Sequence, residues 1–203
     1  MVHKLSNHVR ARLVREIGDA DRVAQQGNLT EARTRFKAIE EEAGKLGIRS
    51  GDLEWYLARV LDNLGEPVAA FDHVLAALEL DPLAAHINRS FDIIVERLHS
   101  ALSAAPAEED VQPIYERLRR AGAADEACHV AMARRLVAAG RTDEAIALLD
   151  SVTRLYPNYR DAWVELMEAA KKAGQADVVS RVERELTLLD HGGDLGGEGR
   201  ATA

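Results

Sequence analysis

Two stretches, Ala138-Ala-Gly140-Arg-Thr-Asp-Glu-Ala145 and Lys172-Ala-Gly174-Gln-Ala-Asp-Val-Val179, share one pattern, and their glycines are 34 residues apart. In each, the glycine ends a run of helically spaced apolar residues, and a second such run follows. Glycine readily adopts the left-handed conformation that commonly closes a helix. The fifth residue after each glycine, Ala145 or Val179, is small or β-branched, so two paired helices can approach closely. The pattern predicts a helix, a tight turn and a second helix.

The same pattern occurs twice in the first half of the chain. There, Gly27 precedes Ala32 and Gly65 precedes Ala70 by the same five residues. Two of the four repeats end in proline, 17 residues after the glycine, at Pro82 and Pro157. Polar residues just after the turns can cap the second helix of a pair; we expect this of Asn28, Thr142 and Asp177.

The period and the apolar positions resemble the tetratricopeptide repeat family, whose repeat is 34 residues long. The matching positions in the best repeat are Met132, Ala133, Leu136, Gly140, Ala145, Leu149 and Pro157. A second repeat matches at Leu57, Ala58, Leu61, Gly65, Ala70, Val74 and Pro82. The resemblance implies an all-α, right-handed superhelical solenoid of about five helix pairs in one domain, residues 1–190. We expect the repeats at about 10–47, 51–84, 85–122, 126–159 and 160–190.

The third repeat departs most from the pattern. Apolar spacing predicts a long first helix from Ala85 to about Ala104, broken between Ala104 and Asp110. Asp110 can cap a second helix that stops near Gly122. After the last repeat, residues 191–203 are rich in glycine and poor in apolar side chains, so we expect a disordered tail.

Composition narrows the classes of function. Lys and Arg total 26 against 34 Asp and Glu, giving a net charge of −8, which disfavours binding to nucleic acid or an anionic membrane. The single cysteine, Cys128, cannot form an internal disulfide, and no signal peptide is visible, so a cytoplasmic location is expected. Arg outnumbers Lys 21 to 5, a hint of a GC-rich bacterial genome.

No catalytic motif is recognisable, so we expect no enzyme activity, no cofactor and no metal. The sequence contains no phosphate-binding glycine loop, no HExxH and no GxSxG. Cys128 and His129 come nearest to a reactive pair, as a thiolate activated by an imidazole. However, adjacent helical side chains point about 100° apart, which favours packing roles for both.

The tetratricopeptide resemblance implies a concave groove, lined by the first helix of each repeat, that holds a peptide or a helix of another protein. The candidate groove residues are Trp55, Tyr56, Arg59, Asn63, Arg89, Arg97 and Arg134. Arginine suits bidentate binding of carboxylates, which would favour an acidic partner. Each arginine could instead pair with a neighbouring acid. Trp55 is either an aromatic anchor for the partner or a residue packed against 47–50.

The expected function is therefore that of a protein-binding adaptor or scaffold. Regulation of an enzyme or transcription factor, and self-assembly into homo-oligomers, are the alternatives. Some tetratricopeptide proteins grip chaperone tails with a clamp of Lys and Asn. Here the clamp positions hold Ile17, Asp21, Ala127 and Ala131, so chaperone binding is not expected.

Overall fold

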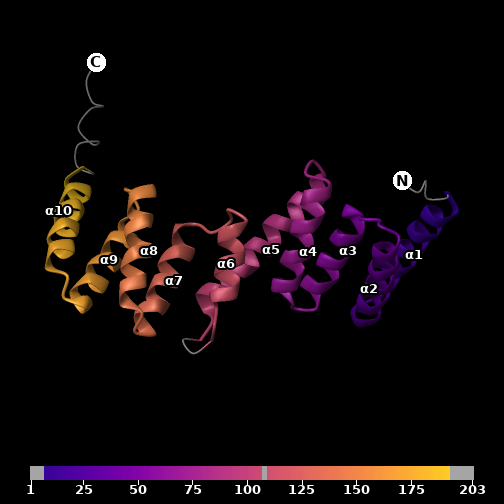
Figure 1. The fold of residues 1–203 in the computed structure, drawn as a ribbon, viewed down its shortest axis with the longest axis horizontal. Helices are drawn as coiled ribbons and strands as arrows, with labels where there is room; N and C mark the ends of the chain where they lie inside the picture. The colour runs from indigo at the N-terminus through magenta and orange to yellow at the C-terminus, as the bar shows by residue number, and fades with distance from the viewer. Residues whose placement is uncertain (1–6, 107–108, 193–203) are drawn as a thin grey trace, which may run out of the picture. The chain divides into compact units, whose positions relative to one another are not determined.

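A computed structural model describes residues 7–106 and 109–192, and this part of the chain contains ten helices and no strand (Figure 1). The predicted all-α fold of paired helices is confirmed. The helices are α1 (Asn7–Gln25), α2 (Leu29–Lys45), α3 (Gly51–Asn63), α4 (Pro67–Leu80), α5 (Ala85–Ala104), α6 (Gln112–Arg120), α7 (Glu126–Ala138), α8 (Thr142–Leu155), α9 (Arg160–Ala173) and α10 (Ala176–Gly192). Most of the predicted tail, residues 193–203, lies outside the described residues.

The chain divides into two compact units. The N-terminal unit extends to Leu98, and the C-terminal unit starts at His99, so α5 contributes its first part to one and its last part to the other. Within the described residues, no helix is long and apolar enough to cross a membrane.

The N-terminal unit is a stack of helix pairs in which α1 packs on α2, α2 on α3 and α3 on α4. Ala32 and Ala70, at the predicted close-approach positions, are fully buried. Phe71 of α4 is also fully buried, and its ring stacks on that of Phe91 in α5 at a centroid distance of 5.8 Å. Alanine at the helix crossings therefore lets the larger side chains fill the layer between the pairs.

The C-terminal unit repeats this arrangement from α7 to α10, where each helix packs on the next. In addition, α7 contacts α9, so the first helices of successive pairs lie beside each other. Ala145 and Leu166 are buried at the crossings. Trp163 is nearly buried, and its indole N–H donates to the carbonyl of Pro157 at 2.7 Å. This bond ties the start of α9 to the turn that precedes it.

The glycine turns are formed as predicted. Gly27, Gly65, Gly140 and Gly174 all have positive φ values between 71° and 87°. This conformation is strained for a residue with a Cβ, which explains why glycine punctuates each pair.

The predicted helix caps are wrong for the second helices. The Asn28 side chain makes no cap hydrogen bond, because its backbone (φ −81°, ψ 60°) is outside the extended region that capping needs. Thr142 and Asp177 are already the first residue of α8 and the second of α10. Only one residue separates each of the four left-handed turn glycines from the first residue of the next helix, so the predicted capping residues lie too close to, or already within, that helix. Capping side chains occur instead on first helices, where Ser50 and Asp125 accept the N–H groups of Leu53 and Cys128.

Asp110 lies at the entry to α6 as expected. Its carboxylate accepts the N–H of Gln112 at 3.0 Å, while Val111 occupies the N-cap position itself. The predicted long helix from Ala85 to Ala104 is formed, and α6 stops at Arg120, two residues before the left-handed Gly122.

Candidate functional site

Three of the predicted groove residues form one cluster in the N-terminal unit. The Arg59 guanidinium lies over the rings of Trp55 and Tyr56, at 4.9 and 5.1 Å from their centroids. Arg59 also pairs with Asp21 of α1. Burial raises the pKa of the Tyr56 hydroxyl, and the nearby Asp21 carboxylate acts in the same direction. The cluster is therefore a half-buried, charge-balanced arrangement rather than a row of free cations.

Trp55 directs its ring toward α5. Its indole N–H donates to Ser90 Oγ at 2.8 Å, and the ring meets the His86 imidazole edge-on at 4.6 Å. A half-buried ring with a satisfied N–H joins two helices of the unit. Contact with a partner through the remaining exposed part of the ring stays a prediction.

The other predicted groove residues do not join this cluster. Arg97 of α5 binds Asp62 of α3 at 2.8 Å, and Asn63 donates its side-chain amide to the Arg59 carbonyl at 2.9 Å. Arg89 is exposed and has no ion pair among the residues that the structure describes. Arg134 lies on α7 in the C-terminal unit.

Three of the predicted arginines share one geometry, because each pairs with an acid on the first helix of an adjacent pair. The pairs are Asp21–Arg59, Asp62–Arg97 and Arg134–Glu165. We call these three ion pairs the inter-repeat pairs. The interpretation that each arginine pairs with a neighbouring acid therefore describes Arg59, Arg97 and Arg134 in this structure.

Replacing Trp55 with alanine is expected to lower the free energy of unfolding of the N-terminal unit by about 2 kcal/mol, because the change removes a half-buried ring and its hydrogen bond. Trp55→Phe keeps the ring and should cost about 1 kcal/mol, the value of the lost hydrogen bond. Ser90→Ala removes the same bond from the other side and should match Trp55→Phe. Urea denaturation followed by circular dichroism measures all three. An unchanged stability for Trp55→Ala would instead leave partner contact as the ring's main role.

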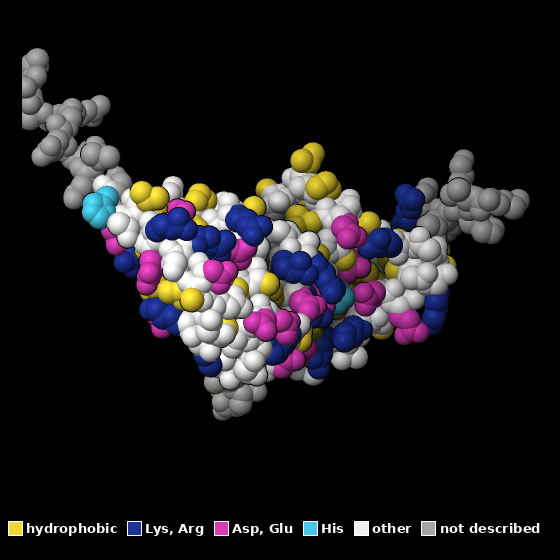
Figure 2. Space-filling model, turned by 60° about the vertical axis from the view of Figure 1, so that its left-hand side comes forward, with side chains coloured by type: hydrophobic (Ala, Val, Ile, Leu, Met, Phe, Trp, Pro, Cys, Tyr) yellow, Lys and Arg dark blue, Asp and Glu magenta, His cyan; other side chains and the backbone are white. Residues whose placement is uncertain are grey.

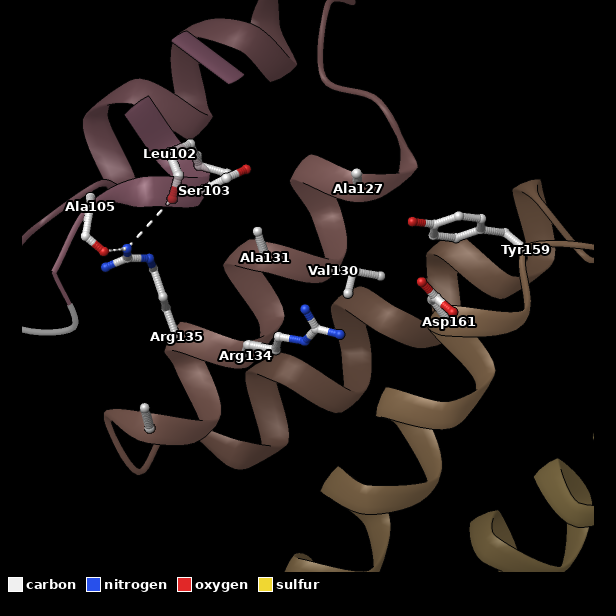
Figure 3. A pocket seen from close by; sticks show the side chains of 11 residues that line it. Leu102, Ser103, Ala105, Ala127, Val130, Ala131, Arg134, Arg135, Tyr159 and Asp161 are labelled. Carbon is white, nitrogen blue, oxygen red and sulfur yellow. Dashed lines mark hydrogen bonds between the residues drawn. The ribbon is translucent and has the colours of Figure 1, made fainter. Parts of the chain in front are cut away.

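A pocket of about 490 Å³ lies in the C-terminal unit (Figure 3). It is lined by the end of α5, one face of α7 and the turn into α9. The lining residues are Leu102, Ser103, Ala105, Ala127, Val130, Ala131, Arg134, Arg135, Ala138, Tyr159 and Asp161. Small side chains at Ala127, Ala131 and Ala138 recur along one face of α7 and leave the space open. We call this the α7 pocket.

Two adjacent arginines of the α7 pocket have different environments. Arg134 is 58% exposed and binds Glu165 of α9 at 2.8 Å. Arg135 is half-buried and donates to the carbonyls of Leu102, Ala105, Pro106 and Glu109. Figure 3 shows Arg135 directed at the end of α5, while Arg134 lies on the same side as Asp161 and Tyr159. Arg135 thus holds the segment after α5 in place, and Arg134 is available at the surface.

Sequence reasoning identified Arg134 on this face but missed Tyr159, Asp161 and the end of α5. The small residues carried a signal, since Ala127 and Ala131 occupy the positions where a clamp was sought. Alanine at these two positions, in place of the longer clamp side chains, leaves the space that forms part of the α7 pocket.

The surface charge is mixed. Figure 2 shows dark-blue basic and magenta acidic side chains interleaved on the face in view, with no extended basic area there. An electrostatic footprint for nucleic acid would be a basic stripe, and this face has none.

Cys128 and His129 do not form a reactive pair. The His129 Nδ1 atom lies 2.8 Å from the Tyr115 hydroxyl, and burial lowers the pKa of this imidazole. Burial raises the pKa of the Cys128 thiol to about 12, with the Asp125 carboxylate adding to the effect. The two neighbours on α7 serve separate contacts, as the helical geometry predicts.

Two groups of side chains bring metal-binding atoms together among the described residues. His73, Glu54 and Glu40 meet in the N-terminal unit, and His99, Asp125 and Cys128 meet in the C-terminal unit. In the first group, His73 Nδ1 lies 2.8 Å from Glu54 Oε2, and this hydrogen bond raises the pKa of the imidazole. A protonated His73 satisfies that group without a metal.

The family comparison matches the C-terminal unit. A model of the tetratricopeptide repeat matches residues 126–169, which contain α7, α8 and the first part of α9. The predicted resemblance to this family is confirmed, on the repeat that carries its pattern best and that lines the α7 pocket. No curated protein matches the sequence.

Solved structures provide weak likenesses in fold. MamA of strain AMB-1 is 15% identical, with a TM-score of 0.43 and coverage of 94% of this chain and 100% of that one. MamA from Desulfovibrio magneticus RS-1 is 13% identical, with a TM-score of 0.39 and coverage of 89% and 96%. PilF of Pseudomonas aeruginosa is 15% identical, with a TM-score of 0.39 and coverage of 87% and 76%. Likenesses at this level carry no argument about function.

Proposed function

We propose that the protein is a cytoplasmic, non-catalytic adaptor that binds a segment of another protein in the α7 pocket. The observation that carries this proposal is the pocket itself, a volume of about 490 Å³ on the first helix of the best-matched repeat. Peptide and cofactor sites are concave, largely apolar and oriented by a few polar groups. The α7 pocket combines an apolar floor of small side chains with polar groups at Arg134, Tyr159 and Asp161.

The lining suggests the chemistry of the bound segment. Ala127, Val130 and Ala131 offer an apolar floor without bulky side chains, so the partner can insert apolar side chains of its own. The exposed Arg134 guanidinium can exchange Glu165 for a carboxylate of the partner, in the bidentate geometry that arginine favours. On the same side of the pocket as Arg134, the Tyr159 hydroxyl and the Asp161 carboxylate provide acceptors for backbone N–H groups of the partner. A helix or extended segment with apolar and acidic side chains fits this set.

The experiment compares two alanines that both lie exposed on helices. Ala127→Trp fills the α7 pocket, whereas Ala147→Trp adds the same ring to α8, away from the lining. A partner captured from a lysate of the source organism is purified and titrated against the full chain and both variants. We expect Ala127→Trp to weaken binding at least tenfold, about 1.4 kcal/mol, and Ala147→Trp to leave it unchanged.

Equal affinity for both tryptophan variants would contradict the α7 pocket as the binding site. Light scattering of the chain alone separates a second copy from a different protein as the occupant. Arg134→Glu should slow association and flatten the salt dependence of binding, as expected when a charge on the rim steers an acidic partner.

A further inference from the structure

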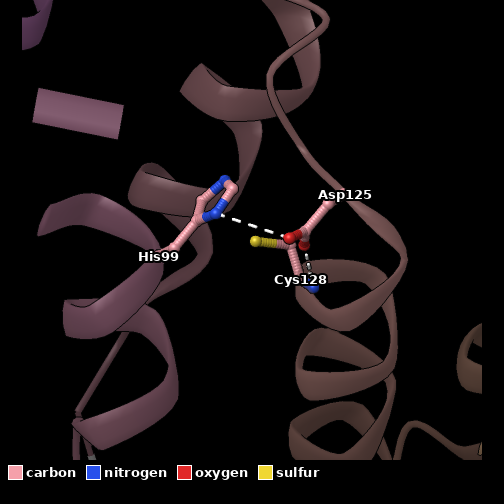
Figure 4. A group of neighbouring side chains, drawn as sticks. All are labelled: His99, Asp125 and Cys128. Carbon is pink, nitrogen blue, oxygen red and sulfur yellow. Dashed lines mark hydrogen bonds and ion pairs between the residues drawn. The ribbon is translucent and has the colours of Figure 1, made fainter. Parts of the chain in front are cut away.

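Three side chains with metal-binding atoms converge in the C-terminal unit, and none of them belongs to a residue that lines the α7 pocket. His99 comes from the last part of α5, Asp125 precedes α7, and Cys128 lies in the first turn of α7. One ligand atom from each residue lies within 4.8 Å of the other two. Figure 4 shows the Cys128 sulfur and the Asp125 carboxylate on the side of the His99 ring that carries the dashed ion pair.

The His99 ring is held in the tautomer that a metal requires. Its Nε2 atom lies 2.8 Å from the carbonyl oxygen of Ala123, which can only accept a hydrogen bond, so Nε2 carries the proton. In a neutral ring, the lone pair is then on Nδ1, which lies 3.5 Å from Asp125 Oδ2. Metal-binding histidines almost always donate their second N–H to a carbonyl or carboxylate in this way.

The other two residues place their ligand atoms beside each other and close to His99. Asp125 Oδ1 accepts the Cys128 N–H at 2.8 Å as a helix cap, which leaves Oδ2 directed at His99. The Cys128 side chain is buried, so its sulfur is shielded from other reactions. Burial keeps the free Cys128 thiol protonated, and the thiol would lose this proton to solvent on binding the metal, because a metal ion deprotonates a coordinating thiol.

We propose that His99 Nδ1, Asp125 Oδ2 and Cys128 Sγ bind one Zn²⁺ ion. Nitrogen, oxygen and sulfur in one set suit zinc, whereas Mg²⁺ and Ca²⁺ prefer oxygen alone. Tetrahedral zinc with bonds of 2.0–2.3 Å holds its ligand atoms about 3.3–3.8 Å apart, so a small contraction of the group completes the site. The Asp125 side chain is 46% exposed, and water can occupy the fourth position from that side.

The zinc ion would link two elements that the repeat pattern connects poorly. The third predicted repeat is the most irregular, and α6 has few contacts beyond α7. Coordination of one ion by His99 of α5 and Cys128 of α7 would link these two helices directly and stabilise this part of the C-terminal unit. The proposed zinc site shares no residue with the lining of the α7 pocket.

The test uses the full chain stripped of metal with a chelator. We expect one equivalent of Zn²⁺ to bind by titration calorimetry and to raise the melting temperature. We also expect Co²⁺ to give the intense absorption of thiolate-bound tetrahedral cobalt. His99→Gln keeps the N–H to Ala123, and Asp125→Asn keeps the helix cap, so both should fold. Each should weaken zinc binding at least tenfold, and Cys128→Ser should abolish the thiolate absorption.

His129→Gln is the matched control, since His129 is next to Cys128 but hydrogen-bonded to Tyr115. It should bind zinc as the wild type does. Absence of stoichiometric zinc binding would overturn the proposal and leave a His99–Asp125 ion pair in its place. Zinc binding that survives Cys128→Ser and His99→Gln, or that is lost equally in His129→Gln, would also overturn it.

Discussion

Phe71→Ala is expected to cost about 3–5 kcal/mol of stability in the N-terminal unit, the range for a large aromatic residue removed from a packed core. Phe71 is fully buried on α4, and its ring stacks on Phe91 of α5. The alanine would leave a cavity between two helix pairs that the rigid helices cannot close. A loss of this size is a large part of the stability of an ordinary domain.

Urea denaturation followed by circular dichroism measures the effect of Phe71→Ala. Leu83→Ala is the control, because Leu83 is equally apolar but 91% exposed in the turn after α4. The control should change stability by less than about 0.5 kcal/mol. A similar cost for both variants would mean that the α4–α5 layer is not the core of this unit.

Arg135→Ala is expected to lower the stability of the C-terminal unit by about 2–3 kcal/mol, since hydrogen bonds from a charged group are worth about 1.5–3 kcal/mol and the loss leaves carbonyls unpaired. The Arg135 guanidinium donates to four backbone carbonyls at and beyond the end of α5. The Leu102 carbonyl is one of the last in α5, where the partial negative charge of the helix C-terminus is stabilised by a cation. Without it, the connection between α5 and α6 should open to protease.

Limited proteolysis and thermal melting together test this role of Arg135. Arg134→Ala removes the neighbouring exposed arginine and should change the melting temperature little, because exposed ion pairs contribute about 0–1 kcal/mol. Arg135→Lys keeps the charge but cannot reach as many carbonyls. Its melting temperature should therefore lie between those of Arg134→Ala and Arg135→Ala. Equal cleavage rates at the α5–α6 connection in Arg134→Ala and Arg135→Ala would contradict the assignment.

The parts of the fold that depend on local chemistry were predictable. The four left-handed glycines were predictable because few other residues adopt that backbone readily, and Ala32 and Ala70 were predictable because a close helix crossing needs a small side chain. The caps at Asn28, Thr142 and Asp177 were not, since a spacing of one or two residues in a tight turn decides whether a side chain faces the helix end. Residue type alone does not reveal that spacing.

The sites depended on contacts between distant parts of the chain. Sequence reasoning weighed Cys128 against its neighbour His129, whereas the fold places His99 beside it from another helix. It also ranked Arg134 with Arg59 and Arg97 and assigned nothing to Arg135. The carbonyls that Arg135 binds are available because α5 ends at Ala104. The sequence around Arg135 contains no pattern that predicts this contact with a distant segment.

The charge order of the inter-repeat pairs restricts which helix pairs can follow one another along the chain. In the N-terminal unit the acid lies on the earlier helix and the arginine on the later one, as in Asp62 with Arg97. In the C-terminal unit the polarity is reversed, with Arg134 before Glu165. A duplicated or exchanged hairpin that set α9 behind α3 would bring Glu165 toward Asp62, two negative charges. These pairs add little to stability, but they favour one order of helix pairs over another. A helix pair copied within its own unit would meet a residue of opposite charge, whereas one copied into the other unit would meet a residue of the same charge.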